Sequence, residues 1–146
     1  MLLWPGNAPA EGPSSPLITY LWIALGGALG SMARYGCSSL AARWVGETFP
    51  WGTLFINVAG SLVIGFFATL TGPDGRVLVA PDARQFVMVG LCGGYTTFSS
   101  FSLQTLNLVR DGDMLAAGGN IAGSVVLCLV AVWLGHVAAA ALNQTR

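Results

Sequence analysis

The sequence has no lysine, one histidine and few charged residues of any kind. Charged side chains make up 8% of the 146 residues, whereas about a quarter of the residues in a soluble domain are charged. The net charge of zero argues against a nucleic-acid partner, because little basic charge is available to neutralise phosphates. Since 54% of the residues are hydrophobic, we expect lipid to be the main solvent of this chain.

Asp, Glu, Lys and Arg are absent from four long stretches, residues 17–33, 49–72, 85–109 and 114–145. A bilayer core about 30 Å thick needs about 20 helical residues. Three stretches exceed this length, and the first can span with local thinning of the bilayer or with Arg34 reaching the interface. We therefore predict an all-α membrane protein with four transmembrane helices, which form a single domain over residues 17–145.

The segments outside these spans are polar or rich in proline. Residues 1–16 hold four of the seven prolines and no basic residue, so they lack the start of a secretory signal and predict a flexible tail. We expect a short interfacial helix within residues 34–50, a polar loop over 72–84 and a tight turn over 110–113.

Cysteine and catalytic side chains are also scarce. Cys37, Cys92 and Cys128 are odd in number, and two of them fall inside predicted spans. They are expected to be small buried side chains rather than a disulfide framework or a metal site. No nucleophile, base and orienting group occur together, so the chain is not expected to be an enzyme.

The six arginines divide evenly between the two sides of the membrane. With four spans both termini lie on one side, which has three arginines (Arg76, Arg84, Arg146), and the other side also has three (Arg34, Arg43, Arg110). Orientation normally follows an excess of Lys and Arg in cytoplasmic loops. Either some other feature fixes one orientation, or the protein inserts both ways and pairs antiparallel, which we favour.

Two spans carry polar residues at a spacing of four, which places them on one helical face. In the second span these are Thr53, Asn57 and Ser61. An amide in the membrane is costly without a partner, so Asn57 predicts either a helix–helix hydrogen bond or a functional group. The fourth span carries a chemically weaker stripe, for which packing is the favoured interpretation: Asn120, Ser124 and Cys128.

The third span contains three glycines and two threonines within residues 90–97. Each glycine costs a helix about 1 kcal/mol relative to alanine, so this segment predicts a break in mid-membrane. Non-helical backbone at that depth must be buried in protein or line a watery path, and its freed carbonyls can coordinate a cation such as Na⁺. The alternative is close packing through Gly90 and Gly94, a spacing that also occurs at Gly26 and Gly30.

Two phenylalanines and two serines follow this segment, each pair three residues apart: Phe98 with Phe101, and Ser99 with Ser102. Hydroxyl groups offer donors to an anion without a fixed charge, and aromatic rings have a positive edge. On spacing alone, however, packing or contact with lipid is the favoured interpretation of the phenylalanines.

Three segments of the sequence, taken together, favour a functional role for these residues over packing. Residues 26–35, 51–61 and 90–102 resemble the Fluc (CrcB) family of bacterial fluoride channels, in the family's order and spacing. The resemblance extends over about residues 23–135, and its most specific part is the Gly-Gly-x-Thr-Thr-Phe-Ser-x-Phe-Ser pattern of residues 93–102.

The resemblance implies a passive, multi-pass channel in the bacterial inner membrane that lowers cytoplasmic fluoride. It also implies an antiparallel, dual-topology homodimer with two pores and a structural Na⁺ at its centre. The implied roles are a pore amide (Asn57), paired pore rings (Phe98, Phe101), part of a polar track (Ser99, Ser102), backbone ligands of Na⁺ (Gly93, Thr96) and a basic residue at the vestibule (Arg34).

The chain departs from the family pattern at two positions of the third span. Gln104 stands where a Glu is expected, which puts any charge-dependent access step in doubt, and Tyr95 stands where Leu is expected. The main alternative function is a small dual-topology proton-coupled exporter. That chemistry needs a carboxylate within the membrane, and the four charge-free stretches contain none. A membrane scaffold would explain the glycine spacings but not Asn57.

Overall fold

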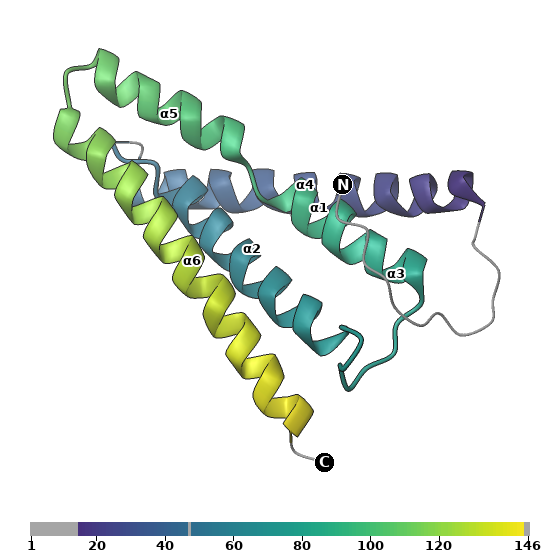
Figure 1. Cartoon of the computed structure of the whole chain (residues 1–146). Coiled ribbons are helices and arrows are strands. Elements are labelled where there is room, and N and C mark those ends of the chain that lie inside the picture. Colours follow the sequence, from purple (N-terminus) through teal and green to yellow (C-terminus); the bar gives the residue numbers. More distant parts are fainter. Residues whose placement is uncertain (1–14, 47, 145–146) are drawn as a thin grey trace.

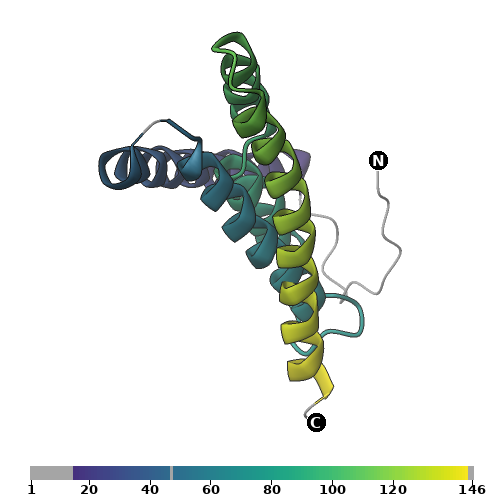
Figure 2. The ribbon, with the colours of Figure 1, turned by 90° about the vertical axis from the view of Figure 1, so that its left-hand side faces the viewer.

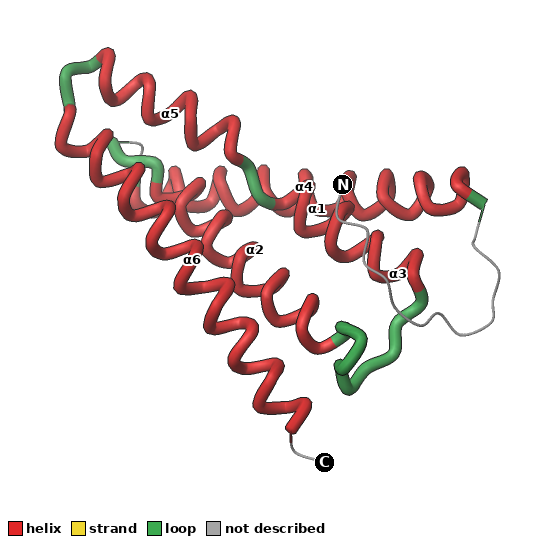
Figure 3. Tube along the Cα trace, viewed as in Figure 1, coloured by secondary structure: helices red, strands yellow, loops and turns green. Residues whose placement is uncertain are grey.

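The computed structural model describes residues 15–46 and 48–144, and over this part of the chain all regular structure is helical (Figures 1 and 3). Residues 1–14 of the tail predicted over residues 1–16 lie outside it, and Pro16 already begins the first helix. The first, second and last helices are α1 (Pro16–Val45), α2 (Trp51–Leu70) and α6 (Met114–Gln144). The third span consists of α3 (Pro81–Gln85), η1 (Phe86–Cys92), α4 (Gly93–Tyr95) and, after two extended residues, α5 (Phe98–Arg110).

The outward surfaces of these helices are apolar. Four helical segments are long and apolar enough to cross a membrane: Pro16–Val45, Trp51–Leu70, Pro81–Arg110 and Met114–Gln144. Large side chains such as Leu115 (88% exposed) and Leu129 (63% exposed) point away from the protein, as expected where lipid replaces water. The structure therefore confirms the prediction of four transmembrane helices.

The first helix differs from the prediction. Residues 34–45 were expected to begin a separate interfacial helix, but they continue α1 without interruption as its last three turns. Arg34 is the first charged residue after the apolar stretch, but the helix continues through it. The helix ends at Gly46, which adopts a positive φ of 83° and donates its backbone N–H to the Ala42 carbonyl at 3.1 Å.

Helices α2 and α6 lie side by side along their lengths (Figures 1 and 2). The contact is close because Gly65 of α2 faces the backbone of Val132, and Gly135 of α6 faces the backbone of Leu62. A Cβ atom at either glycine would collide with the opposite helix. Since lipid is as apolar as leucine, such close packing rather than hydrophobic burial holds the two helices together.

Helix α1 crosses the other helices obliquely and packs against the first part of the third span (Figures 1 and 2). An added Cβ at Gly90 would lie 2.9 Å from the Gly26 Cα atom, and one at Gly94 would lie 2.6 Å from the Gly27 carbonyl oxygen. The close glycine packing that the sequence analysis gave as the alternative to a break is therefore present. It occurs together with the predicted break in the span, which begins directly after Tyr95.

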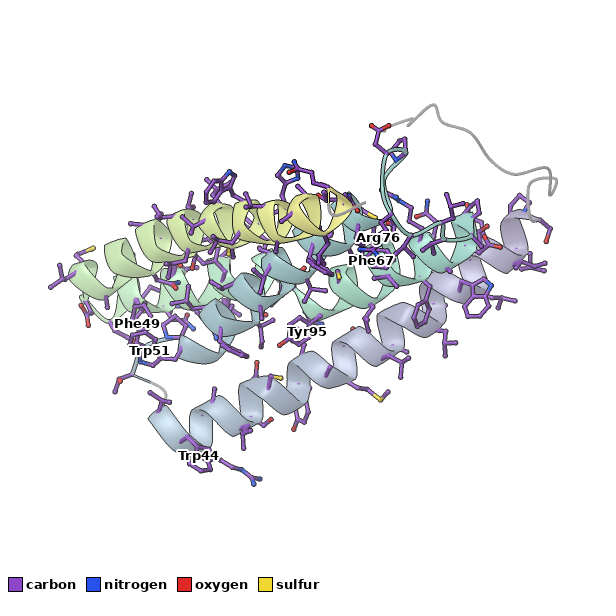
Figure 4. All side chains as sticks on the ribbon, turned by 90° about the horizontal axis from the view of Figure 1, so that it is seen from below. Trp44, Phe49, Trp51, Phe67, Arg76 and Tyr95 are labelled. Atoms are coloured by element: carbon purple, nitrogen blue, oxygen red, sulfur yellow. The ribbon has the colours of Figure 1, made fainter. Side chains whose placement is uncertain are left out.

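Aromatic side chains mark the ends and the centre of this arrangement (Figure 4). At the start of α2, the rings of Phe49 and Trp51 lie 4.6 Å apart, and Trp44 at the end of α1 is 83% exposed. Tyr95 lies between α1 and α2, where its hydroxyl donates to the Cys37 sulfur at 3.5 Å and its ring lies 3.4 Å from where a Cβ atom at Gly60 would be. The unexpected tyrosine thus links the end of α4 to α1.

Candidate functional site at the break of the third span

The break consists of Thr96 and Thr97, whose backbone is extended. The helix that ends at Tyr95 is closed by Thr96, whose N–H and hydroxyl both donate to the Cys92 carbonyl at 2.9 Å. The new helix, α5, begins with Thr97 as its N-cap, because the Thr97 hydroxyl accepts the Ser100 N–H at 3.2 Å. The two threonines therefore end one helix and start the next.

Asn57 of α2 holds the break in place. Its side-chain Nδ2 donates to the Thr97 carbonyl at 3.0 Å, and its Oδ1 accepts the Thr97 N–H at 2.8 Å. Both hydrogen bonds replace partners that a continuous helix would have supplied. Of the two interpretations of Asn57, the hydrogen bond between spans is thus present. An amide NH₂ has two hydrogens, so Asn57 keeps a second donor beyond the one that Thr97 uses.

A cavity of about 340 Å³ opens beside the break. Asn57 lines it together with both phenylalanines that the sequence singled out, Phe98 and Phe101, whose ring centroids are 5.2 Å apart. Gly93 and Thr96 line it as well. The fold therefore brings Asn57 and the two phenylalanines, about 40 positions apart in the chain, to the same cavity. The spacing of residues within each segment does not predict this.

The two helix ends at the break have opposite polarity. The backbone N–H groups in the first turn of α5 give this end a partial positive charge, which favours an anion. The carbonyl groups at the end of α4 give a partial negative charge, which favours a cation. The Gly93 carbonyl would normally accept the Thr97 N–H, but that N–H donates to Asn57 instead.

Three predicted site residues lie elsewhere. Ser99 and Ser102 are exposed on α5 and are not among the residues that line this cavity; the Ser102 hydroxyl donates to the Phe98 carbonyl at 2.9 Å. Arg34 is half-buried on α1, about 17 Å of helix before Val45 at 1.5 Å per residue. It belongs to the helix itself and not to the connector in which the prediction placed it.

The fourth span contributes residues that the sequence interpretation assigned to packing. Asn120, 1% exposed, does form a helix–helix contact, because its Nδ2 donates to the Thr105 hydroxyl at 2.8 Å. Ser124 and Cys128, however, line the cavity. Their spacing of four with Asn120 was the available signal, but it does not reveal which side of α6 faces the break.

A second cavity of about 410 Å³ lies between the start of α2 and the later part of α5. Thr53, Gln104 and Asn107 are among its lining residues. The Gln104 side-chain oxygen Oε1 is buried and accepts no hydrogen bond within the described part of the chain. The departure from Glu at this position therefore leaves a neutral acceptor beside a polar cavity.

Comparison with known proteins assigns this chain to a family. The family model described as "CrcB-like protein, Camphor Resistance (CrcB)" matches residues 21–136, most of the chain. The chain belongs to the CrcB family. The family expected from the three sequence segments is thus confirmed, and every predicted site residue falls within the matched range.

Several curated CrcB relatives are similar over nearly their whole length. A protein of Opitutus terrae, named fluoride-specific ion channel FluC, is 68% identical over 127 residues, which cover 87% of this chain and 96% of the relative. Proteins with the same name from Methylocella silvestris and Rhodospirillum rubrum are each 63% identical, with 97% and 98% of their lengths covered. The four apolar helices and these relatives indicate a multi-pass membrane protein.

Proposed function

We propose that this chain forms a fluoride-selective channel, and not an enzyme, in the bacterial inner membrane. It lets fluoride leave the cytoplasm passively, down its electrochemical gradient. The observation that carries this proposal is the shared cavity of Asn57, Phe98 and Phe101 at the start of α5. The name of the relatives, fluoride-specific ion channel, at up to 68% identity, supports the choice of fluoride.

The cavity offers an anion weak ligands rather than a fixed positive charge. The second Nδ2 hydrogen of Asn57, the first turn of α5 and the positive edges of the two rings all favour an anion. None of the arginines in the described part of the chain lines this cavity. Binding of this kind is attractive enough for entry yet weak enough for exit, as conduction requires.

The residues around Gly93 fit a structural Na⁺. Gly93 is exposed, and the nearest atom to an added Cβ would be the Met88 carbonyl oxygen at 3.8 Å. The Thr97 N–H, which would bond to the Gly93 carbonyl in a continuous helix, donates to Asn57 instead. Carbonyl oxygens at a broken helix are hard ligands that suit Na⁺. The Gly93 and Thr96 carbonyls would hold the ion, which would neutralise their partial negative charge and stabilise the break.

An antiparallel, dual-topology homodimer is the assembly that best explains the exposed parts of the break. Phe98 is 77% exposed although it lines the cavity, and Gly93 is open. A second copy would cover both. The even division of arginines between the two sides favours insertion in both orientations. We also propose that Arg34 is the basic residue at the vestibule of the pore.

A proton-coupled exporter fits this chain less well. Asp82 is the one carboxylate within the four spanning segments, and it lies in the first turn of α3, where the Thr19 hydroxyl donates to it at 2.7 Å. An exporter of that kind needs a titrating carboxylate at its substrate site. The cavity at the break has none among its lining residues.

Efflux from liposomes tests the proposal. Vesicles with the purified protein are loaded with potassium fluoride or potassium chloride, and valinomycin is added to compensate the charge. We expect rapid fluoride release without a pH gradient, while chloride stays inside. Equal release of chloride would contradict the selectivity, and release that needs a proton gradient would favour the exporter.

The dual topology has its own test. Asp74→Lys with Leu78→Lys places two lysines in the exposed loop between α2 and α3 and should fix one orientation, so that fluoride flux falls. Co-expression with Asp111→Lys and Leu115→Lys, which lie in the turn after α5 and in the first turn of α6, should restore flux because these lysines bias the opposite side of the protein. If the first variant conducts like the parent and cysteine labelling shows a single orientation, the working dimer is parallel.

A further inference from the structure

Three residues with sulfur-bearing side chains are among those that line the cavity at the break. Met88 and Cys92 come from η1, one turn apart, and Cys128 comes from α6. The chain has three cysteines in total, so two of them face one cavity of about 340 Å³. The fluoride path proposed above makes no use of these sulfur atoms.

The thiols of this cavity differ from the third one. Cys37 is also free, but its sulfur accepts the Tyr95 hydroxyl and lies away from the cavity. Cys92 is 5% exposed and Cys128 is half-buried, and neither is in a disulfide. For the side chains of Cys92 and Cys128 no hydrogen bond is found within the described residues. Both are therefore available as ligands.

Thiol and thioether groups are soft ligands, which select soft metal ions such as copper(I) and silver(I) over hard ions such as Na⁺. A mostly apolar cavity with two thiols and a thioether among its lining residues presents the donor set that a univalent soft ion prefers. The deprotonated thiols are the binding form, so metal binding releases protons.

We propose that Met88, Cys92 and Cys128 form a binding site for a soft univalent metal ion. Each thiol loses its proton to solvent and forms a metal–sulfur bond, with no change of oxidation state. Two thiolates and one univalent ion together carry a single negative charge. The charged complex occupies the cavity of Asn57 and Phe101 and repels anions, so the metal blocks flux; this second step rests on the proposed channel function.

Silver binding to the purified full-length protein tests the site. Protein in detergent and chloride-free nitrate buffer is mixed with silver nitrate, passed over a desalting column, and its silver content is measured per chain. We expect one tightly held silver per chain, unaffected by a large excess of Na⁺. Affinity should fall at least tenfold in Cys92→Ala and in Cys128→Ser, and by a smaller factor in Met88→Leu.

The matched control is Cys37→Ser, which removes the thiol outside the cavity and should keep the tightly bound silver. Each variant is first checked for helical content and a single peak in gel filtration. Silver retained by the Cys92→Ala, Cys128→Ser double variant, or lost with Cys37→Ser, would overturn the site.

Fluoride efflux separates the two parts of the proposal. Silver should stop efflux from liposomes with the parent protein and leave at least nine tenths of the flux that the double variant shows before silver is added. Bound silver with continued flux in the parent would overturn the block while the site stands. Bound silver in a protein that never conducts fluoride would overturn the proposed function and leave the metal site intact.

Discussion

The two halves of the third span meet the rest of the molecule in opposite ways. Residues 81–95 pack backbone to backbone against α1, because Gly90 and Gly94 leave no room for a Cβ atom. Residues 98–110 lie along α6 and expose large side chains, with Phe98 77% and Leu103 60% exposed. The first half is packed within one chain at Gly90 and Gly94, whereas the second half presents large exposed side chains to its surroundings.

The two halves of the third span contribute differently to the structure and to the proposed function. The packed half fixes the position of the break, and the open half supplies the rings and the helix end that face the cavity. Asn57 joins the two, because it bonds to Thr97 between them. Substitutions of the packed glycines, Gly90 and Gly94, should therefore change stability, and substitutions of the two rings in the open half should change flux.

The largest effect is expected at the junction itself. Asn57→Asp loses the donor to the Thr97 carbonyl and adds negative charge to the cavity, so fluoride flux should fall at least about 100-fold, which corresponds to about 2.7 kcal/mol. Asn143→Asp is the matched control. It makes the same change at the far end of α6, and its flux should stay within about twofold of the parent. Equal losses in both variants would show a general effect of charge.

The phenylalanines test the open half directly. Phe98→Ile and Phe101→Ile should each lower flux about tenfold or more, because both rings line the cavity. Their stabilities should differ: Phe101 is 8% exposed, so its replacement should cost about 1–2 kcal/mol in thermal unfolding, while Phe98→Ile should cost less than about 0.5 kcal/mol. Normal flux in Phe98→Ile would mean that this ring faces lipid only.

Two adjacent glycines test the packed half. In Gly94→Ala the added Cβ lies 2.6 Å from the Gly27 carbonyl oxygen, so unfolding in detergent should become easier by about 1–3 kcal/mol. In Gly93→Ala the nearest atom is the Met88 carbonyl oxygen at 3.8 Å, so stability should be unchanged or higher by up to about 1 kcal/mol. Equal destabilisation would mean that the break, rather than the packing, limits stability.

The smallest effect is expected at the cap of α5. Thr97→Ala removes the oxygen that accepts the Ser100 N–H and should cost about 1 kcal/mol. Thr97→Ser keeps that oxygen and should recover most of the loss. Hydrogen exchange at the Ser100 amide measures the cap separately from global unfolding, and unchanged exchange in Thr97→Ala would show that other contacts fix this helix end.

The sequence alone determined the number of membrane-spanning segments and the position of the break. Four charge-free stretches of sufficient length leave helices as the only spanning structure, because backbone groups in lipid must pair within the segment. The glycines and threonines of residues 90–97 predicted the break for the same local reason, their low helix propensity. A polar loop and a tight turn between the spans were also expected from local chemistry, although α3 begins within the expected loop, at Pro81.

Tertiary structure decided how far α1 continues and which residues meet at the break. Arg34 suggested an early end for α1, but a helix ends where backbone geometry changes, here at Gly46. The interpretation of Asn57 needed its partner, Thr97, which is 40 residues away and invisible to local spacing. Ser124 and Cys128 line the cavity because α6 packs on α2 through Gly65 and Gly135. That contact sets the rotation of α6, and a periodic pattern cannot supply it when every face of the helix is apolar.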